Sequence, residues 1–162
     1  MSRFVRRLAH PRVVVAAQTL TALAFLAASL AKIGDAATFA RQIHHFRLVP
    51  FGLENLAAIT LPWIELVLAL AILSRMRPRA GSLVGLGLMT VFVLAVAAAL
   101  ARRLDIECGC FGTADATRVG AAKLIENLGL TALAGIGCLT PRPPVAPGSV
   151  SAAPPSRAIS VP

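Results

Sequence analysis

Four long apolar stretches restrict the fold of this sequence more than any other feature. The hydrocarbon core of a bilayer is about 30 Å thick, and a helix needs roughly 20 residues to cross it, because lipid cannot satisfy backbone N–H and C=O groups. Residues 13–33, 55–74, 80–101 and 119–139 meet this length. We therefore expect an all-α, polytopic integral membrane protein that folds as a four-helix bundle over residues 13–139.

The composition agrees with a membrane protein. The chain is 57% hydrophobic and 14% charged, whereas water-soluble domains have about 45–50% apolar and about 25% charged residues. The first apolar stretch follows Arg3, Arg6 and Arg7, as the apolar region of a signal peptide would. That region spans only about 7–15 residues in a cleavable signal peptide, so we expect the longer stretch here to remain as a helix.

The arginines indicate how the chain is oriented, because short loops rich in Lys and Arg stay in the cytoplasm. If both termini are cytoplasmic, nine arginines lie on the cytoplasmic side and five on the opposite side. The net charge of +9, which alone would suggest a nucleic-acid partner, then reports topology instead. The cytoplasmic set is Arg3, Arg6, Arg7, Arg12, Arg75, Arg77, Arg79, Arg142 and Arg157, and the opposite set is Arg41, Arg47, Arg102, Arg103 and Arg118.

This orientation assigns the segments outside the apolar stretches. Residues 1–12 form a basic cytoplasmic arm, and residues 140–162 form a cytoplasmic tail rich in Pro, Ser and Ala that we expect to be disordered. The connectors 34–54 and 102–118 face the periplasm or the cell exterior. The protein is thus predicted to be a multi-pass protein of the bacterial inner membrane.

The first outer connector carries a helical pattern. Phe39, Ile43, Phe46 and Val49 or Pro50 recur at intervals of three to four residues, with polar residues between them. This spacing predicts a short amphipathic helix on the outer membrane surface. We expect the run from Val49 to Gly52 to end it, because proline removes a hydrogen-bond donor and disfavours helix at the preceding residue.

Cys108 and Cys110, separated by Gly109, are the residues most suited to chemistry. One intervening residue lies at the edge of disulfide geometry, which places the Cα atoms about 4.4–6.8 Å apart, and glycine allows the bend. A bridge in so small a loop should be strained, and strained exposed disulfides are the exchange-active ones. We expect a thiol–disulfide exchange pair in an oxidising compartment; a structural bridge and a pair of metal-ligating thiolates are the alternatives.

A metal site is not predicted. A closed site takes about four ligands, and only His44 and His45 lie on the same side as the two thiols. Adjacent side chains on a helix point about 100° apart, so the two histidines are poorly placed to share an ion. Cys138 lies near the cytoplasmic end of the fourth stretch, a bilayer away, and we expect it to be a small buried hydrophobe.

Four charged residues lie within the apolar stretches. Glu65 is near the middle of the second stretch, where it must face the bundle interior, and its candidate roles are a proton relay, a contact to a quinone, or a structural contact between helices. Lys32 and Lys123 lie at the depth of the cysteine loop, where a cation would stabilise a thiolate; simple snorkelling to the interface is the alternative. Lys123 and Glu126, three residues apart, are placed to form an ion pair.

Several of these residues together resemble the MauE family of methylamine utilization proteins and its relatives among the small, four-helix DoxX-like membrane proteins. One departure is Glu126 before Asn127, where the family commonly has arginine. The resemblance extends over residues 28–139 and rests on Lys32, Asp35, Phe39, Val49-Pro50, Leu61-Pro62-Trp63-Ile64-Glu65-Leu66, Phe92 and Cys108-Gly109-Cys110-Phe111-Gly112.

The resemblance implies a redox-associated protein that supports thiol–disulfide exchange, maturation or export of a periplasmic protein, namely the small subunit of methylamine dehydrogenase. The implied partners, besides the lipid bilayer, are a periplasmic thioredoxin-like protein and the immature disulfide-rich subunit. Apart from the resemblance, the exchange interpretation of Cys108 and Cys110 makes the chain a candidate component of a thiol–disulfide oxidoreductase, with a membrane quinone as a candidate cofactor.

Two other functions stay open. The first is a non-enzymatic membrane assembly or export factor in which Cys108 and Cys110 form a structural bridge. The second is a small transporter that uses Glu65 as an ion or proton site.

Overall fold

The computed structural model describes residues 8–50, 52–106, 109 and 118–139, and apart from a single bridge residue, Arg118, the regular secondary structure in these ranges is helical. The predictions for Cys108, Cys110, the beginning of the basic arm and the tail concern residues outside these ranges. The helices are α2 (Pro11–Gly34), α3 (Ala36–Phe46), α4 (Leu53–Leu73), α5 (Pro78–Ala101) and α6 (Ala121–Gly137).

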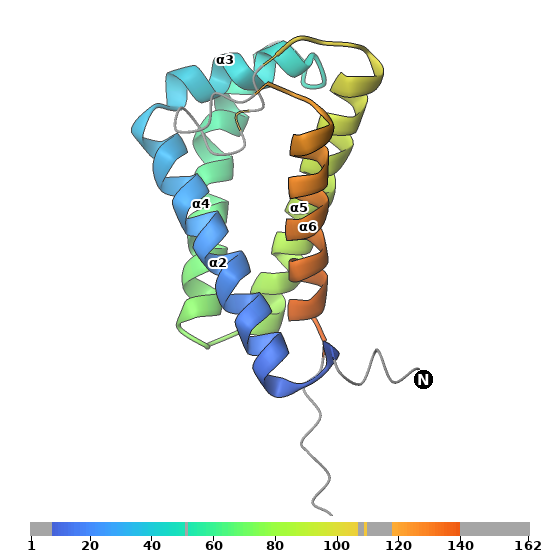
Figure 1. Cartoon of the computed structure of the whole chain (residues 1–162). Helices are drawn as coiled ribbons and strands as arrows, with labels where there is room; N and C mark the ends of the chain where they lie inside the picture. The colour runs from blue at the N-terminus through green and yellow to red at the C-terminus, as the bar shows by residue number, and fades with distance from the viewer. Residues whose placement is uncertain (1–7, 51, 107–108, 110–117, 140–162) are drawn as a thin grey trace, which may run out of the picture.

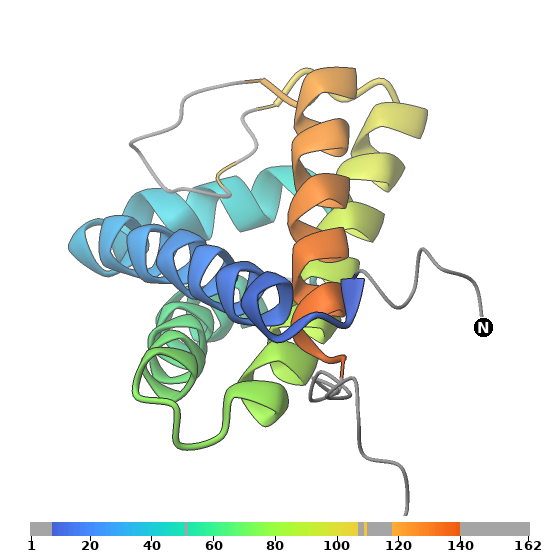
Figure 2. The ribbon, with the colours of Figure 1, turned by 60° about the horizontal axis from the view of Figure 1, so that its bottom comes forward.

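Four of these helices run up and down beside one another, and α3 lies across one end of them (Figure 1). The most extensive contacts join α2 to α4 and α5 to α6. Figure 2, turned by 60°, shows the same two pairs side by side. The start of α2, the turn between α4 and α5 and the end of α6 meet at the end opposite α3 (Figure 1). Both outer connectors predicted from the sequence therefore begin at the end where α3 lies.

Local sequence signals set the ends of the helices. Pro11 and Pro78 occupy the first turns of α2 and α5, where the missing N–H of proline costs no hydrogen bond. Asp35 is the N-cap of α3, and its side chain accepts a hydrogen bond from the Thr38 backbone N–H at 3.0 Å. Arg47 ends α3 in the left-handed conformation, with φ at 51°.

The bundle is apolar on its outside and partly polar inside. Exposed large hydrophobic side chains occur along all four long helices, among them Leu20, Trp63, Leu94 and Ile125. Polar side chains, in contrast, are among the most deeply buried: Gln18, Thr21, Ser29, Lys32, Glu65, Ser82, Lys123 and Asn127. A helix that is apolar all round belongs in lipid or in the core of a larger protein, and intramembrane polar residues face the bundle interior.

Among the helices of the described residues, three are long and apolar enough to cross a membrane: α2, α4 and α5. The fourth stretch was expected to span 119–139, whereas α6 is shorter, at 17 residues. Gly120 is extended, and the Val119 N–H donates to the Ile106 carbonyl at 2.8 Å, so the chain before Ala121 pairs with the preceding connector instead of forming helix. The short helix expected in the first connector is present as α3, but it ends at Phe46, before the Val49-Pro50 pair predicted to end it.

Glycines allow the helices to approach closely, as small residues do at helix contacts in membranes. A Cβ atom at Gly85 of α5 would lie 3.0 Å from the Phe25 ring of α2. One at Gly137 of α6 would lie 2.8 Å from Ser82 Oγ and 3.2 Å from Gln18 Cγ. Gly87, also on α5, is exposed and has no such neighbour within 4 Å.

Replacing Gly85 with leucine is therefore expected to destabilise the bundle by about 1–3 kcal/mol, the usual cost of overpacking. The matched change Gly87→Leu adds the same side chain on the exposed face and should leave the free energy of unfolding nearly unchanged. The measurement is reversible unfolding in mixed micelles with increasing sodium dodecyl sulfate, followed by circular dichroism. Equal losses in the two variants would contradict the close packing of Gly85 against Phe25.

Candidate functional site

A buried ion pair between Lys32 of α2 and Glu65 of α4 forms the centre of the candidate site. Lys32 Nζ lies 2.6 Å from Glu65 Oε1, and the two side chains are 1% and 0% exposed. Neither charge would be stable alone in so dry an environment, because an unpaired buried ion loses its hydration without compensation. The pair therefore fixes α2 against α4.

Two phenyl rings complete the surroundings of the Lys32 ammonium. Nζ lies 5.0 Å from the centre of the Phe39 ring and 5.1 Å from that of Phe92. These distances are within the range of cation–π attraction, about 6 Å. Because Phe39 belongs to α3 and Phe92 to α5, the ammonium contacts side chains from three other helices once Glu65 of α4 is included.

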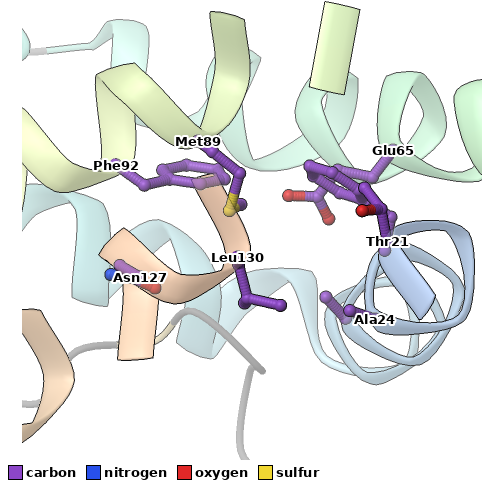
Figure 3. Close-up of a pocket in the computed structure, with 9 residues that line it drawn as sticks. Thr21, Ala24, Glu65, Met89, Phe92, Asn127 and Leu130 are labelled. Carbon is purple, nitrogen blue, oxygen red and sulfur yellow. The ribbon is translucent and has the colours of Figure 1, made fainter. Parts of the chain in front are cut away.

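A small cavity of about 20 Å³ lies on the carboxylate side of the pair. Figure 3 shows Glu65 and Thr21 on one side of this cavity and Asn127 on the opposite side, with Met89 and Leu130 between them. Thr21 Oγ1 and Glu65 Oε2 are both buried without a hydrogen-bond partner among the described residues. The volume is enough for one water molecule.

A larger cavity of about 160 Å³ lies on the ammonium side of the pair. Phe92 lines both cavities, so the ion pair and this ring separate them. Gln42 is 4% exposed, and its Oε1 atom has no hydrogen-bond partner among the described residues. Lys32 and Gln42 are the polar residues in the wall of the large cavity, and its other lining residues are apolar: Phe39, Ile43, Phe46, Leu48, Val49, Ala57, Leu61, Val91, Phe92, Ala95, Val96 and Gly109.

Gly109 connects the predicted thiol pair to this cavity. It is buried, and φ is +65°, in the left-handed region that favours glycine. A Cβ atom at this position would overlap the Gln42 side chain, with Gln42 Cδ at 2.8 Å. Cys108 and Cys110 lie outside the described residues, but the residue between them is seated on α3 at the wall of the large cavity.

The other predicted site residues have separate surroundings. Lys123 Nζ lies 2.8 Å from Glu126 Oε2, which confirms the expected ion pair within α6. Cys138 is half-buried and not fully buried as expected, and its thiol donates to the Ala134 carbonyl at 3.2 Å at the end of α6. Among the described residues no group of three His, Cys, Asp or Glu side chains is arranged to hold a metal ion.

Polar contacts hold α3 in place over the large cavity. His44 Nδ1 lies 2.9 Å from Glu54 Oε1, and the Gly52 backbone N–H donates to Glu54 Oε2 at 2.6 Å. Arg102, at the end of α5, donates to the Phe46 carbonyl at 3.2 Å. His44, although exposed, therefore joins α3 to the first turn of α4.

Polar contacts also close the opposite end of the bundle. Gln18 Nε2 donates to the Gly137 carbonyl at 2.8 Å, and Arg75 Nη1 donates to Gln18 Oε1 at 2.9 Å. Gln18 of α2 thereby links the end of α6 to the turn between α4 and α5. Arg75, counted from the sequence only as a cytoplasmic charge, has a structural partner as well.

The sequence did not predict that Gln42 and Thr21 line the two cavities with buried oxygens that have no hydrogen-bond partner among the described residues. The pattern Phe39, Ile43, Phe46 defined an apolar face of α3, and Gln42 lies on this same face, three residues after Phe39. A polar residue on an apolar face was the available signal. The signal at Thr21 was weaker, because the hydroxyl of a threonine in a membrane helix commonly donates a hydrogen bond to a backbone carbonyl of the same helix.

Breaking the buried pair is expected to be costly. Lys32→Met or Glu65→Met alone should lower the free energy of unfolding by about 3–5 kcal/mol, since each leaves an uncompensated buried charge. The double variant should lose less free energy of unfolding than either single variant, because it leaves no unpaired charge in the interior. Asp105→Met is the matched control: Asp105 and its partner Arg118 are 71% and 75% exposed, so the loss in free energy of unfolding should stay below about 1 kcal/mol. Losses that simply add in a double-mutant cycle of unfolding free energies would contradict the interaction.

The cap of α3 is expected to depend on pH. Hydrogen bonding from the Thr38 side chain, and then from its backbone N–H, lowers the pKa of Asp35 from its ordinary value of 3.8. A lowered pKa means that the cap stabilises α3 above the ordinary value and that this contribution is lost as the pH falls through the lower, folded-state value.

Amide hydrogen exchange of Thr38 measures this effect. Protection of the Thr38 amide should fall on acidification in the wild type and should be low at every pH in Asp35→Ala. Asp35→Asn retains a capping acceptor but cannot titrate, so its protection should not change with pH. A decline in Asp35→Asn equal to that of the wild type would refute the assignment.

Comparison with known proteins agrees with the resemblance drawn from the sequence. The family model described as "Methylamine utilisation protein MauE" matches residues 11–140. A "Methylamine utilization protein MauE" of Paracoccus denitrificans is 30% identical over 145 residues, which cover 89% of this chain and 77% of that protein. One of Methylorubrum extorquens is 34% identical over 141 residues, covering 86% and 76%. No solved structure matches the chain. The chain belongs to the MauE family.

Proposed function

We propose that this protein is an inner-membrane component of methylamine utilisation in which Cys108 and Cys110 exchange disulfides with a periplasmic protein. The pathway follows from the names of its relatives, which are methylamine utilization proteins. The partner is a thioredoxin-like protein, the immature disulfide-rich small subunit of methylamine dehydrogenase, or both in sequence.

The burial of Gly109 is the observation that carries the proposal. A cysteine pair on a free loop would have a solvated glycine between its members, whereas Gly109 is buried against Gln42 and lines a cavity beside Lys32. The bundle thus anchors the centre of the Cys-Gly-Cys segment while leaving each thiol one residue away from that anchor. An anchored pair is what repeated exchange requires, because attack on a disulfide depends on access and on the surroundings of the attacking thiolate.

The exchange itself is balanced between two dithiol–disulfide pairs. A thiolate of the reduced partner attacks the Cys108–Cys110 disulfide, and a mixed disulfide forms as one cysteine leaves as thiolate. The second partner thiol then displaces the other cysteine, which gives an oxidised partner and a reduced Cys108/Cys110 pair. The reverse sequence reduces the partner instead.

The proposed membrane arrangement has both termini in the cytoplasm and α6 as the fourth span. The arginine-rich turn between α4 and α5 lies at one end of the bundle, and α3 lies at the other (Figure 1). In this arrangement Gly109 is on the periplasmic side, together with α3. At about 1.5 Å per residue, the 17 residues of α6 reach about 25 Å, which a locally thinned bilayer or flanking residues accommodate.

The second candidate is a non-enzymatic assembly or export factor with a structural Cys108–Cys110 bridge. Close packing of Gly109 on Gln42 favours it as well, because a staple needs the same fixed centre. We do not propose the transporter, since Glu65 is bound to Lys32 and the cavity beside its carboxylate is only about 20 Å³.

Thiol trapping separates the two candidates. Spheroplasts of the native host carrying Cys108→Ser or Cys110→Ser should accumulate a mixed disulfide with a periplasmic protein, since each variant lacks the cysteine that resolves it. In the wild type, a membrane-impermeant maleimide should label the pair only after reduction.

Cys138→Ser, which removes a thiol at the opposite end of the bundle, is the matched control and should trap nothing. Wild-type thiols that never change redox state, together with a double serine variant that still supports growth on methylamine, would establish the structural bridge instead.

A further inference from the structure

We propose that the large cavity binds the head group of a membrane quinone, which accepts electrons from the Cys108/Cys110 dithiol. This inference rests on the proposed exchange function and names the oxidant that returns the reduced pair to its disulfide. It is carried by the size of the cavity, by the two polar groups in its wall and by the position of Gly109.

The volume of the cavity fits a single six-membered ring. It is about 160 Å³, and an engineered apolar cavity of about 150 Å³ is known to hold benzene. The walls suit a flat, apolar ligand, because Phe39, Phe46 and Phe92 contribute three phenyl rings. A peptide segment or a charged metabolite would leave its polar groups without partners on these walls.

The polar groups restrict the ligand further. Gln42 is buried with its Oε1 unpartnered among the described residues, and Lys32 lines the same cavity from another helix. An acyl chain offers nothing to a buried amide, whereas a quinone ring carries two oxygens. A glutamine amide both donates and accepts, so Gln42 can donate to a quinone carbonyl and accept from a hydroquinone hydroxyl. The ammonium of Lys32 is a donor for the carbonyl form.

The ligand would enter from the bilayer. Val91 and Leu48 line the cavity and are also 60% and 48% exposed on the outer surface of the molecule. Val91 belongs to α5, one of the helices long and apolar enough to cross the membrane. A lipid-soluble molecule therefore meets the cavity at an apolar edge.

The reaction balances as a transfer of two electrons and two protons. The Cys108 and Cys110 thiols lose both protons and two electrons and form an S–S bond. The quinone gains the two electrons and two protons and becomes a hydroquinone. Gly109, in the wall of the cavity, places the backbone between the two cysteines beside the ring that receives the electrons.

Binding is tested with decylubiquinone and the full-length protein in nanodiscs, by equilibrium dialysis against empty nanodiscs. Ala95 lines the cavity, and Ala95→Phe fills it. Ala101 is exposed at the end of the same helix, so Ala101→Phe is the matched control. We expect saturable binding in the wild type, in Ala101→Phe and in the variant with both Cys108 and Cys110 changed to serine. Binding should weaken at least tenfold in Ala95→Phe, whose helicity is checked by circular dichroism.

Electron transfer is tested separately, by mixing the reduced protein with decylubiquinone and counting both thiols and hydroquinone. Two thiols should disappear for each hydroquinone formed, in the wild type and in Ala101→Phe but not in Ala95→Phe. No saturable binding, or equal binding in the two phenylalanine variants, overturns the quinone site.

The two proposals fail in different ways. Trapped mixed disulfides without quinone reduction refute the oxidant named here and leave the exchange function standing. Saturable quinone binding without trapped mixed disulfides or thiol loss refutes the exchange function and, with it, the redox part of this inference.

Discussion

The compensation of one buried charge by another is the interaction on which the rest of the structure depends. Lys32 and Glu65 are each almost fully buried and only 2.6 Å apart. Because an ammonium in this environment requires its carboxylate, α2 and α4 can pack here in only one register. The same ammonium lies over the rings of Phe39 and Phe92, which brings α3 and α5 to the pair. Both cavities then form around it, one on each side.

Hydropathy predicted the long helices well, because the apolar content of a span is a property of the sequence itself. The expected stretch 13–33 is contained in α2, and 80–101 is contained in α5. The ends were predicted less well, since they depend on individual backbone conformations. Gly120 is extended before α6, and Arg47 adopts a left-handed conformation after α3. Hydropathy contains no information about either.

The central ion pair could not be read from the sequence. Lysine near the end of a span usually extends to the membrane interface. The sequence therefore placed Lys32 near the outer surface of the membrane and Glu65 near its middle, too far apart to be predicted as a pair. The structure turns Lys32 inward because Glu65 compensates its charge there, and a charge pattern along one chain does not show which helix faces which. Gln42 is a similar case: its place on the apolar face of α3 was visible, but its buried, unpartnered oxygen depends on how α3 lies over the bundle.

Gly109 shows how the loop and the bundle constrain each other. A bend between two cysteines needs a flexible residue, and the left-handed φ of +65° supplies one reason for glycine. Contact with Gln42 supplies a second, independent reason, because a Cβ atom at this position would overlap that side chain. A change in the backbone conformation at Gly109 would therefore change its contact with the Gln42 side chain. Gln42 and Phe39 are the two buried residues of α3, and the Phe39 ring lies 5.0 Å from the Lys32 ammonium, so Gly109 and the central ion pair both lie against side chains of this one short helix.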